Sequence, residues 1–345
     1  MNYNLYTNVL QNIPNHPIEI RNDTYSDKYS IYDVIYNFCY NSNQTKFVIS
    51  LSGGVDSMVL LAIIHHLGFD TIAVHINYNN RTETVSEQQF IEHWCAFNNI
   101  PLYIHSITDI LRSNNKRCDY EKLTNKIRFD FYRDVLTKES AENIILAHHK
   151  DDSIENIITN ICRARSILNL VVIKPSSVIH NVTVIRPVLN VYKQSICDFA
   201  HEHNIPYFKD TTPSWSIRGI LRTHIMPSLT LAFTHNIKNN LLKLDQQTFE
   251  WNQLIHSKII DPFINECVFH EKDVVVPVHK YKAYPSCFWN TIFMKIFFKY
   301  KRNCPSMKSV TSFLSFINNK TTGNFVLSKQ CLCNLNDSSF TISFN

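Results

Sequence analysis

Residues Phe47–Ser57 read FVISLSGGVDS, an apolar run followed by a polar turn with two adjacent glycines. Val48, Ile49 and Leu51 suit a buried parallel strand, and the apolar residues from Val55 onward recur at helical spacing. A strand that turns sharply into a helix directs backbone N–H groups and the positive end of the helix dipole at one point. The segment therefore predicts a phosphate-binding turn between this strand and its helix.

The two glycines are informative because glycine is rare in this chain. Five occur in 345 residues, whereas average usage of about 7% would give roughly 24. Gly53 and Gly54 allow backbone conformations closed to other residues and a close approach to an anion. Ser52 and Ser57 add hydroxyl donors, and Asp56 can hold a Mg²⁺ that bridges phosphates. The alternative is an ordinary turn in which Ser52 or Asp56 caps the helix.

Residues Ser52–Ser57 resemble the SGGxDS loop of the PP-loop, or N-type ATP pyrophosphatase, superfamily. The resemblance implies an adenine nucleotide alpha hydrolase-like fold and cleavage of ATP between its α- and β-phosphates. It assigns nucleotide binding to Ser52, Gly53, Gly54, Val55, Asp56 and Ser57. No GxxxxGK[ST] motif occurs, which disfavours chemistry at the γ-phosphate.

Composition limits the class of protein. A chain of 345 residues with 44% hydrophobic residues can bury a full core and is long enough for two domains. The ten cysteines are scattered without a CxxC motif, which disfavours a disulfide framework or a structural zinc site and favours a reducing compartment. The first ten residues lack the layout of a signal peptide, so we expect a soluble, cytoplasmic protein.

The net charge of +5 conceals an asymmetry along the chain. Residues 271–330 hold ten Lys and Arg against two acidic residues, whereas the first 270 residues carry 24 basic and 26 acidic side chains. A basic region joined to a near-neutral one suits a polyanionic partner such as RNA. We assign RNA binding there to Lys295, Lys299, Lys301 and Arg302; a solvated lysine face is the alternative.

From residue 46 the pattern alternates between strands and helices, which predicts an α/β fold with a parallel sheet. Strands are expected at 46–51, 71–76, 102–107, 143–147 and 182–186, and helices at 27–40, 55–67, 84–98, 119–138, 151–164 and 192–203. Helices at 235–260, 286–300 and 306–318 then precede strands at 324–327, 330–335 and 339–343. We divide the chain into an extension (1–45), a PP-loop ATP-binding catalytic domain (46–232), and a helical linker with a smaller basic α+β domain for substrate or RNA binding (233–345).

Two further segments follow strands and resemble the tRNA(Ile)-lysidine synthase branch of that superfamily. His75, Asn77 and Arg81 match its HxNHxLR segment, although Tyr78 and Asn80 depart from it. The resemblance places His75 and Asn77 near the nucleotide and Arg81 at the RNA; a polar loop with a capping Asn is the alternative.

The second segment, AHHKDDSIEN at residues 147–156, resembles the motif GHHxDDQAET. Two carboxylates that open a helix can bind Mg²⁺ or orient an amine, and a histidine can stabilise phosphate charge or move a proton. We therefore predict catalytic roles for Asp56, His149, Asp151 and Asp152, with Mg²⁺ held by Asp56 and Asp152. An acidic helix start with a capping Asp is the alternative.

Three arginines complete the predicted site. Glu121 and Arg128 match the family helix ExxARxxRYxFF, and we predict a catalytic phosphate contact for Arg128 beside the alternative of a surface salt bridge. Residues 210–229 resemble the segment that closes the lysidine synthase catalytic domain, with Asp210, Arg218 and Arg222 among the matches. Arg218 and Arg222 lie four apart on one helix face, which suits bidentate phosphate binding in RNA. Pro213 and Gly219 replace two asparagines of the pattern.

The ordered series of motifs predicts an ATP-dependent ligase that modifies tRNA. The resemblance implies ATP and Mg²⁺ as cofactors, adenylation of C2 of an anticodon cytidine, and ligation of lysine or another small amine with release of AMP and pyrophosphate. A homodimer is compatible with this hypothesis. The alternatives are a PP-loop tRNA 2-thiolase, which the lack of CxxC motifs disfavours, and a catalytically silent tRNA-binding protein, which the retained acidic residues disfavour.

Overall fold

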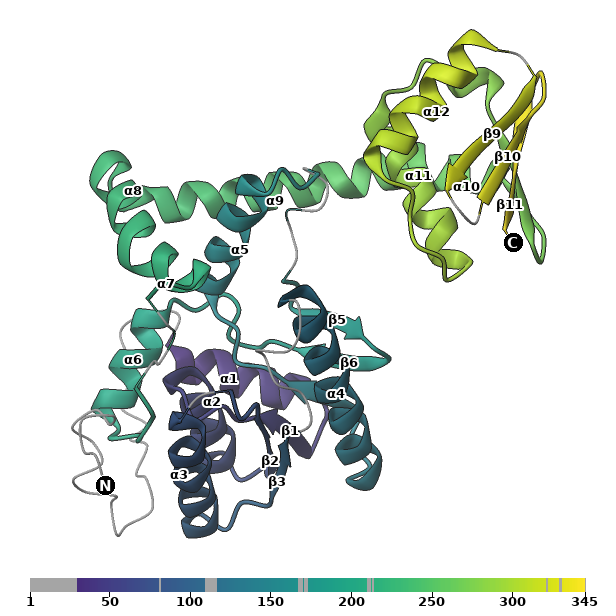
Figure 1. Ribbon diagram of the computed structural model, residues 1–345. Coiled ribbons are helices and arrows are strands. Elements are labelled where there is room, and N and C mark those ends of the chain that lie inside the picture. The colour runs from purple at the N-terminus through teal and green to yellow at the C-terminus, as the bar shows by residue number, and fades with distance from the viewer. Residues whose placement is uncertain are drawn as a thin grey trace. The chain divides into compact units, whose positions relative to one another are not determined.

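A computed structural model describes residues 30–80, 82–108, 117–166, 170, 173–209, 212, 214–320, 322–328 and 331–344 (Figure 1). It divides into two compact units, which we describe separately. The first comprises Met1–Arg163 with Val171–Leu242, and the second comprises Ala164–Leu170 with Lys243–Asn345. None of the described helices is long and apolar enough to cross a membrane.

The first unit is built on a six-stranded sheet in the order β3-β2-β1-β4-β6-β5. Its strands are β1 Lys46–Ser50, β2 Asp70–Asn77, β3 Leu102–Ser106, β4 Asn143–Ile145, β5 Ser176–Ile179 and β6 Val182–Ile185. All neighbours pair in parallel except β5, which pairs with β6 in the antiparallel sense. The predicted parallel α/β sheet is confirmed, and β5 is an edge strand that the sequence pattern did not indicate.

Helices cover both faces of this sheet. They are α1 Ile31–Asn41, α2 Val55–His66, α3 Glu83–Phe97, α4 Arg117–Lys138 and α6 Lys193–Glu202. Helix α5 Lys150–Cys162 follows β4 and packs instead with the segment after α6. Alternation along β1 sends Phe47 and Ile49 into a core with α1, α2, α3 and α6, and Val48 into a second core with α4. Burial on both faces explains why the strand is apolar at successive positions.

Helix α1 belongs to the first of these cores, although we predicted residues 1–45 to be an extension. Its Ile31, Ile35 and Cys39 are buried against the strands and helices of that core. The residues before Ser30 lie outside the described part of the chain.

After α6 the chain forms short helical pieces and one long helix. These are α7 Ile217–Ile220, a π-helix at Leu221–Ile225, α8 Met226–Phe233 and α9 Asn236–Ile255. Leu221, Met226 and Leu229 pack with Ile154 and Ile158 of α5, so the arginine-bearing segment is fixed on the helix that carries the paired carboxylates.

The second unit has a five-stranded antiparallel sheet in the order β7-β8-β11-β10-β9. Its elements are a π-helix at His256–Ile260, α10 Asp261–Glu266, β7 Val268–Phe269, β8 Asp273–Pro277, a 3-10 turn at His279–Tyr281, α11 Ser286–Lys299, α12 Met307–Asn319, β9 Gly323–Ser328, β10 Cys331–Leu335 and β11 Ser339–Phe344. The predicted α+β character is confirmed, with β7 and β8 as strands that were not predicted. Its core centres on the fully buried Trp289, packed among Phe293, Phe313 and Phe340.

Candidate active site

The turn between β1 and α2 takes its shape from Gly53. This residue has φ +81°, a left-handed conformation that favours glycine, and a Cβ there would lie 3.4 Å from Ile91 Cδ1. The carbonyl of Gly53 accepts the backbone N–H of Phe208 at 2.8 Å, which ties the turn to the segment after α6. Gly54 is the N-cap of α2, so the start of that helix faces the space above the sheet.

The two serines of the turn have different surroundings. Ser57 is buried, and its Oγ accepts the backbone N–H of Ser52 at 3.1 Å and donates to the Gly54 carbonyl at 3.1 Å. Ser52 is exposed, with its Oγ 3.0 Å from Ser57 Oγ. Ser57 therefore holds the turn in shape, and the Ser52 hydroxyl is placed where a ligand can reach it.

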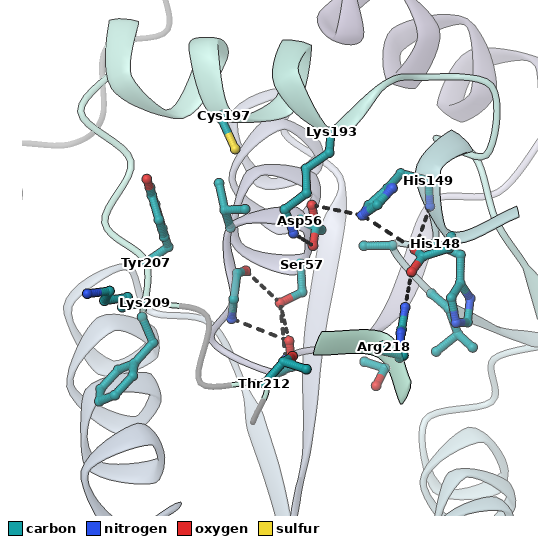
Figure 2. Close-up of a pocket in the computed structure, with 18 of the residues that line it drawn as sticks. Asp56, Ser57, His148, His149, Lys193, Cys197, Tyr207, Lys209, Thr212 and Arg218 are labelled. Atoms are coloured by element: carbon teal, nitrogen blue, oxygen red, sulfur yellow. Dashed lines mark hydrogen bonds and ion pairs between the residues drawn. The ribbon is translucent and has the colours of Figure 1, made fainter. Parts of the chain in front are cut away.

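A cavity of about 600 Å³ opens over this turn (Figure 2). It lies beyond the carboxyl ends of β1 and β4, where ligands bind in open parallel sheets. Among the described residues that line it, five cations face three acids: Arg128, Lys193, Lys209, Arg218 and Arg222, with Asp56, Glu87 and Asp152. This excess of positive charge suits an anionic ligand.

Asp56, on the first turn of α2, is the acidic centre of the cavity. Its Oδ2 accepts a hydrogen bond from Lys193 Nζ at 3.1 Å. Its Oδ1 is buried without a hydrogen-bond partner, and its nearest ionic neighbour is His149 Nε2 at 3.6 Å. A buried carboxylate oxygen with no donor is costly, so this atom is poised for a ligand that supplies one or for a cation.

His149 joins Asp56 to the start of α5. It is the N-cap residue of that helix, and its backbone N–H donates to Asp152 Oδ2 at 3.1 Å. Its ring is buried, with Nε2 3.4 Å from Asp152 Oδ2 and 3.6 Å from Asp56 Oδ1. The imidazole thus lies between the two carboxylates for which we predicted a shared metal.

Asp151 lies on the other side of the His149 ring, with Oδ2 3.9 Å from His149 Nδ1, and is held by two other elements. Its Oδ2 accepts the backbone N–H of Lys193 at 2.9 Å, and its Oδ1 accepts Lys238 Nζ of α9 at 2.6 Å. Burial alone would raise the pKa of Asp151, but these two donors more than offset it and lower that pKa. Asp151 is therefore an anion that fastens the starts of α5, α6 and α9 together.

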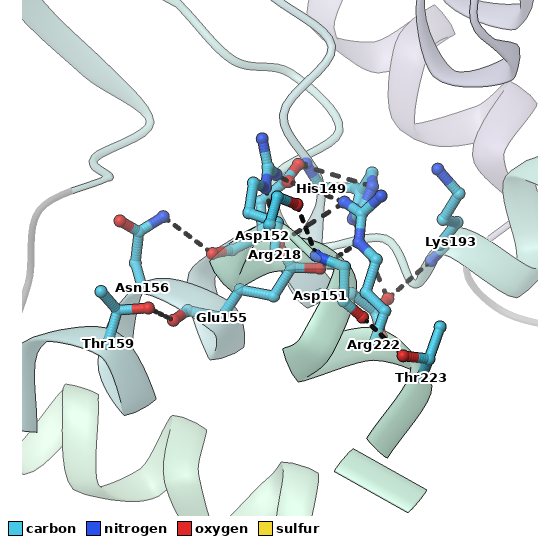
Figure 3. Close-up of polar contacts among 12 residues, drawn as sticks. His149, Asp151, Asp152, Glu155, Asn156, Thr159, Lys193, Arg218, Arg222 and Thr223 are labelled. Carbon is cyan, nitrogen blue, oxygen red and sulfur yellow. Dashed lines mark hydrogen bonds and ion pairs between the residues drawn. The ribbon is translucent and has the colours of Figure 1, made fainter. Parts of the chain in front are cut away.

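Arg218 and Arg222 form a clamp on α5 (Figure 3). Arg218 pairs with Asp152 and, through Nε, with Glu155 at 2.8 Å, and Arg222 Nε reaches Glu155 at 2.5 Å. Burial would raise the pKa of Asp152, yet nearby His149 and Arg218 lower it. The shared helix face that we predicted exists, and its arginines point at carboxylates on α5 as well as lining the cavity.

Arg128 enters the cavity from α4. It lies 5.0 Å from the ring centroid of Phe129, and its Nε is buried without a hydrogen-bond partner. Burial opposes its charge, but the Tyr132 and Tyr78 phenols outweigh that effect and raise its pKa. No described carboxylate forms an ion pair with Arg128, so its charge is available to an anionic ligand.

His148 gives the site a measurable pH dependence. Burial, opposed by Asp152 and assisted by Arg186, whose Nε donates to His148 Nδ1 at 3.1 Å, lowers the pKa of His148 from 6.5 to about 4. A neutral imidazole is thus favoured in the folded state, and the stability that it contributes is complete above about pH 6.5 and declines as the pH falls towards 4.

We expect His148→Asn to reduce the decrease in the free energy of unfolding as the pH falls below 6.5. The amide oxygen can accept the hydrogen bond from Arg186, and it does not titrate. Urea unfolding of both proteins at pH 7.5 and 5.0 measures this decrease, in a range where the carboxylates stay ionised. His75, whose pKa burial also lowers, retains part of the dependence in the variant. Equal slopes for the two proteins would contradict the assignment.

Several predicted residues do not line the cavity. His75 is buried, with Nδ1 2.8 Å from the Leu51 carbonyl, and the Asn77 amide donates to Gln88 Oε1 at 2.8 Å. These bonds shape the loop after β2, and nucleotide contact by either residue stays a prediction. Arg81 and Asp210 lie outside the described residues.

The cations predicted to bind RNA in the second unit have mixed surroundings. Lys295 Nζ pairs with Asp261 at 2.9 Å, and Lys299 Nζ lies 3.6 Å from the centroid of the Phe269 ring. Lys301 and Arg302 are exposed just after α11. An RNA contact by these four residues stays a prediction.

The sequence analysis missed Lys193, Lys209 and Lys238. Lys193 is the first residue of α6, where a cation opposes the helix dipole, and this unfavourable placement was a usable signal. Lys209 is exposed on the segment that holds the glycine turn, and Lys238 lies on a helix predicted only as a linker. Neither of these two had a local pattern that would have singled it out.

The carboxylate oxygens beside the glycine turn are of the kind that binds a magnesium ion. Asp56 has a buried oxygen without a hydrogen-bond partner, and Asp152 lies on the other side of His149. Among the described residues, no three His, Cys, Asp or Glu side chains gather as a metal cage. Mg²⁺ commonly binds through one or two carboxylates together with substrate phosphates and water. Asp56 Oδ1 can supply such an oxygen, whereas the oxygens of Asp152 already accept from Arg218 and the His149 backbone N–H, so a site shared by the two residues stays a prediction.

Comparison with known families places this site in context. Residues 28–229 match the PP-loop domain family. The chain is 26% identical over 253 residues to the tRNA(Ile)-lysidine synthase of Staphylococcus epidermidis, covering 68% of this chain and 58% of that protein. It is 26% identical over 219 residues to the enzyme of the same name from Bacteroides thetaiotaomicron, covering 63% and 50%. The chain thus spans little more than half the length of these two relatives.

A solved structure supports the fold alone. The U34-tRNA thiolase of Methanococcus maripaludis, solved with its [4Fe-4S] cluster, superposes with a TM-score of 0.50 and 16% identity. The alignment covers 68% of this chain and 87% of the thiolase.

Proposed function

Because the chain belongs to the PP-loop domain family, we propose that it is an ATP-dependent ligase that forms lysidine in tRNA. Family membership implies ATP binding, and the curated relatives imply a tRNA substrate. The observation that carries the proposal is the glycine turn at residues 52–57, which opens α2 beneath a cavity lined by five cations.

ATP would bind with its β- and γ-phosphates over this turn. The backbone N–H groups at the start of α2 and the Ser52 hydroxyl would donate hydrogen bonds to the leaving pyrophosphate. Lys193, which is hydrogen-bonded to Asp56, partly neutralises the charge of that carboxylate. The α-phosphate would then face Arg128, which has no described carboxylate partner. Mg²⁺, held by Asp56 and Asp152, would neutralise phosphate charge and make the phosphorus more electrophilic.

The first step would be attack by the C2 oxygen of an anticodon cytidine on the α-phosphorus, with pyrophosphate leaving. The base must be extruded from its stack, which costs least in a loop. Arg218 and Arg222 lie at the cavity wall with Asp152 and Glu155 behind them, so their guanidinium groups are oriented before RNA arrives. Oriented cations stabilise developing charge without reorganisation.

The second step would be attack by the amine of lysine on C2, with AMP leaving. Both oxygens of Asp151 already accept bonds from Lys193 and Lys238. An ammonium that binds Asp151 must therefore displace Lys238, whereas Asp56 Oδ1 lacks a hydrogen-bond partner. The oxygens of Asp152 likewise accept from Arg218 and the His149 backbone N–H, so an ammonium would displace a partner at either residue. We assign the substrate ammonium to Asp151 or Asp152 as predicted, and removal of its proton to the same carboxylates with His149 beside them.

The proposed partners are the anticodon region of a tRNA and lysine or another small amine. A homodimer and a cytoplasmic location stay predictions. Gel filtration at micromolar concentration tests the dimer separately from the chemistry.

We expect pyrophosphate release that depends on both tRNA and lysine, with AMP as the second nucleotide product. Mass spectrometry of nucleosides from tRNA incubated with ATP and labelled lysine checks this, since the label should appear on one cytidine. Release of ADP and phosphate would contradict the proposal. Incorporation of sulfur would favour the thiolase alternative, and tRNA binding without any ATP turnover would favour the silent alternative.

A further inference from the structure

A second cavity, of about 560 Å³, lies along α4 in the same unit. Its walls are formed by Lys122, Asn125, Lys126, Asp130 and Arg133 from α4, and by His180 and Asn181 from the turn between β5 and β6. We call it the α4 groove. It shares none of its lining residues with the cavity over the glycine turn.

The basic residues of the groove form a stripe along the helix. At 3.6 residues per turn, Lys122, Lys126 and Arg133 fall within about 40° of one another and span about 16 Å of helix length. All three side chains are exposed. Arg133 pairs with Asp130 at 2.7 Å, whereas no salt bridge joins Lys122 or Lys126 to a described carboxylate. The positive charge that the stripe offers to a ligand is therefore mainly that of Lys122 and Lys126, one helical turn apart.

The facing wall is a hairpin turn of unusual composition. His180 has φ 49° and Asn181 has φ 63°, so two non-glycine residues occupy the left-handed region in succession, as a type I′ turn requires. Arg133 donates to the His180 carbonyl at 3.3 Å, and the His180 ring lies 5.6 Å from that of Phe129. Together with the Asn125 amide nitrogen, which lies 3.4 Å from His180 Nε2, these contacts hold the imidazole beside α4.

From this arrangement we propose that the α4 groove binds the phosphodiester backbone of the RNA substrate. The inference rests on the proposed function and adds a docking surface to it. Two exposed lysines one helical turn apart, beside amide and imidazole groups, suit successive phosphates, and no Phe, Tyr or Trp side chain lines the groove among the described residues to stack a base. Binding there would thus be independent of sequence.

The location also favours the RNA that enters the active site over an unrelated anion. Arg128 lines the catalytic cavity, and it lies about 200° around the helix from Lys126. One helix therefore faces the proposed reaction centre on one side and the groove on the other. A tRNA whose loop enters the cavity could lay its flanking strand across α4.

The test is the double variant Lys122→Glu/Lys126→Glu in the full chain, with unmodified tRNA as the probe. We expect the Kd for tRNA to rise about 10- to 100-fold near 0.1 M salt, and the slope of log Kd against log salt to fall by about two. Lys138→Glu is the matched control, because Lys138 is on the same helix about 160° from Lys122. It should change the Kd less than twofold.

Thermal unfolding and ATP binding without tRNA verify that the double variant is folded. Wild-type affinity and salt slope in the double variant, with tRNA still modified by the wild-type protein, would overturn the groove and leave the proposed function standing. An equal loss in Lys138→Glu would also overturn it, as a general charge effect. A wild-type protein that neither binds nor modifies tRNA would overturn both proposals.

Discussion

Asp56→Asn should lower the rate of pyrophosphate release roughly 10²- to 10³-fold, with little change in the unfolding temperature. The substitution keeps the shape of the side chain but removes the charge that pairs with Lys193 at 3.1 Å and the carboxylate oxygen that lies buried without a hydrogen bond. It also weakens the proposed magnesium site, since an amide is a poorer ligand than a carboxylate. Initial rates with saturating ATP and tRNA measure the effect on kcat.

Asp198→Asn is the matched control for this variant. Asp198 is an exposed carboxylate on α6, hydrogen-bonded to Gln194, and it does not line the cavity. Its substitution should leave the rate within twofold. A kcat for Asp56→Asn close to that of the wild-type protein would remove the acidic centre from the mechanism.

Trp289→Ala should destabilise the second unit by about 3–5 kcal/mol. The side chain is fully buried and packs edge-on against Phe263, Phe288 and Phe313. Its removal leaves a large cavity that this aromatic core cannot refill. Urea unfolding followed by circular dichroism measures the change.

Two variants of the same helix sharpen this prediction. Phe298→Ala removes a side chain that is 86% exposed, so it should cost almost nothing. Trp289→Phe should cost less than Trp289→Ala, because it keeps most of the packing and removes an indole N–H that has no hydrogen-bond partner. A Trp289→Ala variant as stable as Phe298→Ala would mean that this core contributes little.

The parallel sheet was predictable because its strands are short apolar runs separated by longer segments of helix-compatible sequence. β5 was not, because the turn after it is His180–Asn181 and lacks the glycine that marks most tight hairpins. β8 ends at Pro277, which argues against a strand when the sequence is read alone, and β7 has only two residues.

In the site, the sequence indicated residue types but not pairings. Lys193 meets Asp56 across 137 residues of chain, and Lys238 meets Asp151 across 87. Such pairs follow from the folded arrangement of α2, α5, α6 and α9, and no local pattern encodes them. His75 illustrates the converse, since a polar residue at a strand end is also well suited to bonding its neighbouring strand.

The hydrogen bond from Lys238 to Asp151 means that a substrate amine must compete with the Lys238 ammonium for the Asp151 carboxylate. A tethered ammonium behaves as if present at about millimolar concentration or above, so a free one must exceed that level or bring contacts of its own. Ammonia and simple monoamines would then bind Asp151 poorly, whereas an amino acid, whose carboxylate can bind elsewhere in the site, could displace Lys238. Lys238 would thus help to select the amine, because only a substrate with an additional anchoring group could displace it from Asp151.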